Sequence, residues 1–247
     1  MNDPALRKTL IANVITLKVA AFCGLLLCPI YSNAGDADIE FTPLDIFRWS
    51  QKSFVDHTDY TLIDETLINK NSAVTTTDSN THQASKNVRQ VLSAKTHGKA
   101  SALYHETIID LTQTPYLQWR WRVDKKMTVT DAHQKSQDDY PARIYVVVKE
   151  GIFPWQVRSL NYVWASHDPK EVFWPNPYTH RAIMIPLRNS SDNLQQWYGE
   201  KVNIAEDYQR VFGRSITEAH GIAIMSDADN TGGTAHAYYD SLIFSAR

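Results

Sequence analysis

The chain has 247 residues, 43% of them hydrophobic and 21% charged, and its formal net charge is −2. Its 25 lysines and arginines stand against 27 acidic residues, and they form none of the basic clusters that nucleic-acid binding needs. This balance excludes nucleic acid as the expected partner.

Residues 1–34 have the pattern of a cleaved signal peptide. Three basic residues up to Lys18 form the positive region, the apolar run 19–30 follows, and Ala34 ends a Ser-Asn-Ala cleavage sequence. The apolar run is shorter than the ~20 residues that a membrane span needs. We therefore expect cleavage after Ala34, a location in the periplasm of a Gram-negative bacterium, and no membrane span in the mature chain.

The mature chain, residues 35–247, is expected to be a single β-sandwich domain. Removing the three basic residues and one acidic residue of the leader leaves 22 basic and 26 acidic residues. Both cysteines, Cys23 and Cys28, lie in the leader, so the domain enters an oxidising compartment without a disulfide. A chain of this length is long enough to form a substantial core of its own.

Strand patterns dominate the mature chain. In chain order, the expected strands are Phe47–Ser50, Tyr60–Asp64, Arg89–Ala94, Ser101–Ile109, Tyr116–Val123, Arg143–Lys149, Leu160–Trp164, Arg181–Leu187, Gly221–Met225 and Ala235–Phe244. In the fifth of these, Trp119, Trp121 and Val123 alternate with polar residues, which is typical of a strand with one buried face. The β-branched run 143–149 predicts a central strand that is covered on both faces.

One short helix is expected near the C-terminal third of the chain. Asn203 can cap its start, Glu206 stands three positions further on, and Gly213 follows its end. Residues 69–87, rich in Ser, Thr, Asn and Asp, are expected to form an exposed loop. Many strands with one helix predict an all-β fold, an antiparallel β-sandwich of the jelly-roll type.

Five ordered motifs resemble those of a known family. They are Trp119–Val123, Asp138–Val146, Leu160–Trp164, Asp207-Tyr208 with Phe212-Gly213, and Met225–Thr231. In these motifs the chain resembles the bacterial family catalogued as domain of unknown function 3047, from about Trp49 to Phe244. The resemblance implies an exported domain without an assigned activity and gives no catalytic residues. The last strand also resembles, at the level of the fold, galactose-binding-like jelly rolls, which are common among carbohydrate-binding modules.

A saccharide groove would combine carboxylate, amide and guanidinium groups with aromatic platforms. The candidate ligand-binding residues are Asp139, Arg143, Asn161, Trp164, Trp174, Trp197 and Asp207. Asp138 and Asp139 are neighbours in an extended segment and point in opposite directions, so they cannot form a catalytic pair. A structural ion pair with Arg143 is the alternative role for this acidic segment. Trp174 and Trp197 lie in loop-like settings, which favours them as platforms.

A second candidate site is a cation site in the segment that follows the Gly221–Met225 strand. Asp227, Asp229 and Asn230 offer oxygen ligands of the kind that calcium prefers, and Asp240 can add another. Ordinary turn chemistry is the alternative for the same residues. A structural calcium ion is therefore a hypothesis, and no other cofactor is expected.

Three functions remain for the chain. It has no Gly-x-Ser-x-Gly elbow, no phosphate-binding Walker loop and no His-Glu-x-x-His helix. The preferred hypothesis is non-catalytic binding of a polysaccharide or envelope glycan. The alternatives are an envelope structural or protein-interaction domain, and a carboxylate-dependent glycoside hydrolase or lyase that uses acids such as Asp139 and Asp207.

Overall fold

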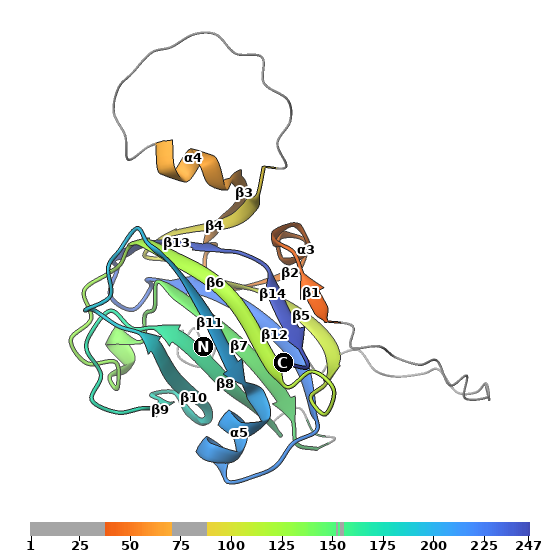
Figure 1. Cartoon of the computed structure of the whole chain (residues 1–247). Helices are drawn as coiled ribbons and strands as arrows, with labels where there is room; N and C mark the ends of the chain where they lie inside the picture. The colour runs from red at the N-terminus through yellow and green to blue at the C-terminus, as the bar shows by residue number, and fades with distance from the viewer. Residues whose placement is uncertain (1–37, 71–87, 152, 154–155) are drawn as a thin grey trace.

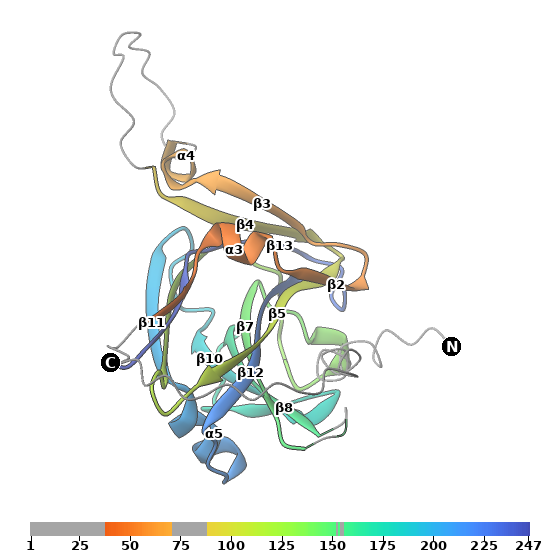
Figure 2. The same ribbon diagram turned by 90° about the vertical axis from the view of Figure 1, so that its right-hand side faces the viewer.

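The computed structural model describes residues 38–70, 88–151, 153 and 156–247. In this part of the chain, two seven-stranded sheets face each other as a β-sandwich (Figures 1 and 2), which confirms the predicted fold class. The predicted leader 1–34 lies outside the described residues, and so does the predicted loop 69–87 from residue 71 onward. None of the described helices has the length and hydropathy of a membrane span.

The two sheets are nearly antiparallel throughout. The first contains, in spatial order, β1 (Ile39–Phe41), β14 (Leu242–Ser245), β6 (Tyr116–Lys125), β13 (Thr234–Tyr239), β4 (Gln90–His97) and β3 (Asp59–Asp64), with β11 (Trp197–Asn203) also paired to β6. The second contains β2 (Ser50–Val55), β5 (Ala100–Asp110), β12 (Glu218–Asp227), β7 (Ala142–Lys149), β8 (Val157–Trp164), β10 (Thr179–Arg188) and β9 (Trp174–Asn176). Among the described pairs, only β8 and β10 run parallel, which the sequence did not predict.

The core between the sheets follows the predicted alternation. Trp119 and Trp121 of β6 are buried there, together with Ile144 of the facing sheet. Tyr145 and Val147 of β7 point to the opposite face, because successive side chains alternate, and they are buried in a second apolar cluster. Strand β7 is therefore covered on both faces, as its composition predicted.

The described chain has three α-helices where one was expected. They are α3 (Pro43–Phe47), α4 (Glu65–Lys70) and α5 (Ile204–Phe212), and a 3₁₀ turn, η1, spans Lys135–Gln137. Helix α5 confirms the prediction. The Asn203 side chain accepts a hydrogen bond from the Glu206 N–H, and Gly213 ends the helix with a φ of 68°.

The predicted strand Phe47–Ser50 is wrong except at Ser50, because a helix that begins after the capping box at Thr42 extends to Phe47 and a turn follows it. The Thr42 side chain accepts from the Asp45 N–H, and the Asp45 carboxylate accepts from the Thr42 N–H. Pro43 occupies the first helical turn, where its missing N–H costs nothing. The helix ends at Phe47 and β2 begins only at Ser50.

The predicted last strand, Ala235–Phe244, is in fact two strands. Asp240 interrupts it: its carboxylate accepts the Ser241 N–H and pairs with Arg120 and Arg89. Strands β13 and β14 then pair with different parts of β6. The short strands β1 and β9 and the longer β11 were not predicted.

One half-buried histidine, His236, makes the stability of this fold depend on pH. Burial lowers the pKa of the His236 imidazole from 6.5 to about 4, and Lys95 acts in the same direction. Between these values the unfolded chain binds the proton and the folded chain does not, so the free energy of unfolding falls as the pH drops from 6.5 to about 4. We expect His236→Gln to flatten this part of the urea-denaturation profile. His180→Gln, at an exposed position, is the control, and an unchanged slope in His236→Gln would contradict the prediction.

Candidate functional site

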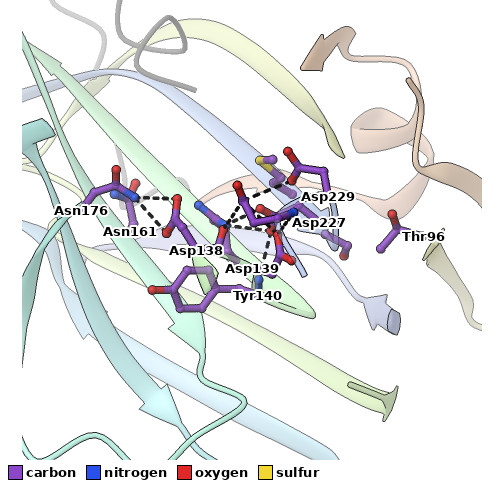
Figure 3. Close-up of polar contacts among 12 residues, drawn as sticks. Thr96, Asp138, Asp139, Tyr140, Asn161, Asn176, Asp227 and Asp229 are labelled. Atoms are coloured by element: carbon purple, nitrogen blue, oxygen red, sulfur yellow. Dashed lines mark hydrogen bonds and ion pairs between the residues drawn. The ribbon is translucent and has the colours of Figure 1, made fainter. Parts of the chain in front are cut away.

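The pairing of β7 with β12 brings two acidic segments together. These strands are antiparallel and Arg143 lies opposite Met225, so the start of β7 lies beside the end of β12. Asp138 and Asp139 precede β7, whereas Asp227 ends β12. Figure 3 shows the resulting polar cluster on the face of the second sheet that points away from the core.

A buried ion pair lies at the centre of this polar cluster. Nη2 of Arg143 donates to both carboxylate oxygens of Asp227, at 2.8 and 2.6 Å, and the two residues are 2% and 0% exposed. The guanidinium also donates to the hydroxyl of Tyr145 and lies 4.4 Å from the ring centre of Tyr140. Burial is the largest single influence and opposes the charged form, but Asp227, Tyr145, Asp138 and Tyr140 together outweigh it and hold the pKa of Arg143 well above its usual value.

The two neighbouring acids diverge, as their spacing predicted, and the segment contacts Arg143 through the Asp138 backbone carbonyl, which accepts from Nη2, and through the Asp138 charge, whereas the carboxylate that pairs with the guanidinium is that of Asp227. Asp138 accepts from the Asn176 amide at 3.0 Å. Asp139 accepts from the backbone N–H groups of Asn230 and Thr231 and from the Thr231 hydroxyl. Asp139 therefore caps the turn after β12, and the predicted structural pair of this acidic segment with Arg143 is corrected to Asp227.

Asn161 lies on the same face of the sheet, on the neighbouring strand. Its amide nitrogen donates to the Met184 sulfur at 3.4 Å, but its Oδ1 atom is buried and has no hydrogen-bond partner. Arg143 Nε is also buried without a partner among the described residues, and the Tyr140 hydroxyl forms no hydrogen bond of standard geometry, although the Trp174 indole N–H lies close enough to lower its pKa slightly. An unpaired buried polar atom costs roughly 1–3 kcal/mol, so a group of them on one face calls for an explanation.

Burial governs the ionisation of the Tyr140 hydroxyl as well. It raises the pKa of this group well above 10, and the charge of Asp138 acts in the same direction. The hydroxyl therefore stays protonated at any physiological pH and can both donate and accept a hydrogen bond.

The predicted aromatic platforms are not free surfaces. Trp164 and Trp174 are 0% and 2% exposed and belong to the apolar clusters, which corrects their expected role as platforms. Trp197 is half-buried on β11, and the guanidinium of Arg120 lies 4.4 Å above its ring. Other side chains of this chain therefore cover the three indole rings that were expected to contact a ligand.

Asp207 lies at the other end of the second sheet. It accepts from the Tyr162 hydroxyl at 2.9 Å and pairs with Arg210, and its neighbour Tyr208 donates to Glu150 just beyond the end of β7. Asp139 instead accepts from the turn at residues 230–231, whereas the Tyr162 ring that bonds Asp207 packs in the core between the sheets. The two carboxylates are therefore held by different parts of the fold, and a hydrolase pair of Asp139 and Asp207 stays a prediction.

The predicted calcium ligands are only partly brought together. Asp227 and Asp229 join Asp139, and one oxygen of each lies within 4.8 Å of the others. Asn230 is adjacent and donates to Asp139, whereas Asp240 is engaged by arginines at the β13–β14 junction. Protein donors already bind Asp139 and Asp227 in this arrangement, so a calcium ion stays a prediction.

Sequence reasoning missed two residues of the cluster. Tyr140 packs on Arg143, and Asn176 holds Asp138. The Trp-Pro-Asn-Pro segment around Asn176 gave no strand signal, and its role depends on a contact across 38 residues of sequence. The one available signal was the conspicuous Asp-Asp-Tyr-Pro segment, which marked the right place on the sheet.

We expect Arg143→Met to lower the free energy of unfolding by about 3–5 kcal/mol, because Asp227 then keeps a buried charge without its guanidinium. Urea denaturation measures this loss. Lys99→Met, which removes the exposed pair with Asp56, is the control and should cost less than about 1 kcal/mol. Replacing Asp227 by Leu in the Arg143→Met variant should recover part of the loss, and equal losses in Arg143→Met and Lys99→Met would contradict the central role of the pair.

Solved structures offer only distant likenesses. The chain covers 22% of the glycoside hydrolase domain of Endo-D from Streptococcus pneumoniae, with 81% of its own length, 11% identity and a TM-score of 0.36. A cellulase derived from the Cel12A enzyme of Rhodothermus marinus is covered over its whole length by 84% of the present chain, at 7% identity and a TM-score of 0.38. For the CBM22-1 xylan-binding domain from Paenibacillus barcinonensis, the coverage is 99% of that chain and 87% of this one, at 6% identity and a TM-score of 0.35.

Sequence comparison identifies the family of the chain. No curated protein matches the chain. One family model, described as "Protein of unknown function (DUF3047)", matches residues 48–243, which include every strand from β2 to β13. The chain therefore belongs to the DUF3047 family.

Proposed function

We propose that this chain binds a saccharide without cleaving it, on the outward face of its second sheet. The observation that carries the proposal is the set of buried polar atoms on that face that form no hydrogen bond of standard geometry: Asn161 Oδ1, Arg143 Nε and the Tyr140 hydroxyl. Each residue is 2% exposed or less, so a ligand reaches these atoms only when the side chains that cover them move aside.

The chemistry of these atoms fits a ligand rich in hydroxyl groups. Arg143 Nε needs an acceptor, Asn161 Oδ1 needs a donor, and the Tyr140 hydroxyl takes either. A sugar hydroxyl both donates and accepts, so neighbouring hydroxyls on one ring can satisfy all three. Apolar side chains on both sides of these atoms, such as Tyr145 and Met184, suit the C–H faces of the ring.

Binding is favoured over hydrolysis by the state of the carboxylates. Hydrolysis needs one carboxyl group that is protonated and another that is free to act on the sugar or on water. Asp227 is held by a guanidinium and a backbone N–H, and Asp139 is held by the turn at residues 230–231. Neither group is available for this chemistry in the observed arrangement.

The same proposal places the protein in the periplasm. Every described strand and helix lies after Ala34, the first being β1 at Ile39. We expect the protein recovered from the periplasmic fraction to begin at Gly35, as determined by N-terminal sequencing. A protein that retains Met1 in the cytoplasmic fraction would contradict export.

Tyr140→Phe tests saccharide binding, because it removes a hydroxyl that forms no hydrogen bond of standard geometry in the protein alone. We expect this variant to be as stable as the parent or about 1 kcal/mol more stable, and to bind saccharide at least tenfold more weakly. Affinity electrophoresis in soluble xylan and calorimetry with cello-oligosaccharides measure binding by residues 35–247, and urea denaturation measures stability.

Tyr162→Phe is the matched control. Tyr162 is equally buried, but its hydroxyl donates to Asp207 and it faces the core. This variant should lose about 1–3 kcal/mol of stability and keep its affinity. Absence of binding to any polysaccharide in a broad panel, or equal affinity in Tyr140→Phe and the parent, would overturn the proposal.

A further inference from the structure

A pocket of about 480 Å³ opens at the edge of the sandwich, where the chain passes from β2 in the second sheet to β3 in the first. This volume lies within the range of small-molecule sites. Its lining includes Phe47, Trp49, Gln51, His57, Asp59 and Tyr60. None of these residues belongs to the polar cluster around Arg143, so the pocket is a separate place on the molecule.

Two aromatic rings form one wall of this edge pocket. Phe47, at the end of α3, is 42% exposed, which is a large exposure for a phenylalanine. Trp49 is half-buried and stacks on His105, with ring centres 5.7 Å apart and planes 13° apart. Phe41 meets the same indole edge-on at 5.4 Å. These contacts fix the plane of the indole, and a fixed ring at a pocket is a ready platform for a flat ligand.

The floor of the edge pocket is already organised by hydrogen bonds to Ser101. The Tyr60 hydroxyl donates to its carbonyl at 2.7 Å, and Gln51 Nε2 donates to its hydroxyl at 3.1 Å. These bonds orient the Gln51 carboxamide without using its oxygen. Gln51, His57 and Asp59 are exposed, so their polar groups can reach a ligand without further burial of the protein.

The charge of the lining restricts the ligand. Asp59 is its one acidic residue, and no lysine or arginine is among the described residues that line the pocket. An anionic ligand would therefore meet a carboxylate and no fixed cation, which is unfavourable. An uncharged ring with an apolar face and peripheral hydroxyls meets the aromatic wall on one side and amide, imidazole and carboxylate groups on the other.

We propose that the edge pocket is a second saccharide site, which takes one uncharged sugar ring against Trp49 and Phe47 and excludes acidic sugars. It stands on different residues from the site proposed above and does not depend on that site. The two sites nevertheless approach each other through β12: the Thr58 hydroxyl at the pocket donates to the Ser226 carbonyl, one residue before Asp227.

The test follows the indole N–H resonance of Trp49 in residues 35–247, assigned by its loss in Trp49→Phe. Glucose, galactose, mannose and xylose are titrated to about 50 mM, since single sugars bind weakly, and glucuronic acid is the charged counterpart of glucose. We expect at least one neutral sugar to shift this resonance saturably and glucuronic acid to leave it unchanged. Phe47→Ala, at an exposed position, should weaken the response at least fivefold, whereas the control Val172→Ala, at a more exposed position that does not line the pocket, should not.

The outcomes separate the two sites. Tyr140→Phe should leave the Trp49 response intact, and its loss in that variant would overturn the existence of a separate pocket. No response to any neutral sugar, or an equal response to glucuronic acid, would overturn the edge site while leaving saccharide binding at the sheet face unaffected. A response that survives in Phe47→Ala would also contradict the proposal, because the aromatic wall would then not contribute.

Discussion

The buried pair between Arg143 and Asp227 is the constraint on which the rest of the second sheet depends. Separated charges at this depth are costly, so the two strands that carry them must stay in one alignment. A slip of one residue between β7 and β12 would turn Arg143 toward the core between the sheets, where Ile144 and Ile224 now pack. The pair also fixes what surrounds it, because the Tyr140 N–H donates to the same carboxylate.

This polar cluster lies between two apolar clusters on a face that sandwiches often leave to solvent. Tyr145 and Met225 belong to one cluster, and Trp174 and Met184 belong to the other. Apolar neighbours strengthen every hydrogen bond that is made and penalise every one that is missing. The unpaired oxygen of Asn161 therefore costs more here than it would at a wetter face. A sequence optimised for stability alone would place an apolar residue there, and this cost is the reason that the proposal above assigns the unpaired atom to a ligand.

Local signals predicted the elements that depend on local physics. The alternation of β6, the β-branched run of β7 and the caps of α5 are each contained in about ten residues, and the structure confirms them. Contacts made across long stretches of chain were the ones missed. Arg143 was assigned a partner in the nearby acidic segment, whereas its partner Asp227 is 84 residues away and becomes a neighbour only when β7 pairs with β12. The strand β11 exists because β6 is there to pair with it.

The tryptophans show that the prediction of binding residues from sequence has the same limit. Exposure of an aromatic ring is decided by what other strands lay against it, so neither composition nor spacing separates a platform from a core residue. Trp174, expected at a binding surface, is buried, whereas Trp49, which was not a candidate, lines the edge pocket. A ligand at either of the two proposed sites would stabilise the fold by the same linkage, set by its affinity and concentration. The sites differ in the source of that affinity: at the sheet face it comes from hydrogen bonds to buried polar atoms, and at the edge pocket from an aromatic wall and exposed polar groups.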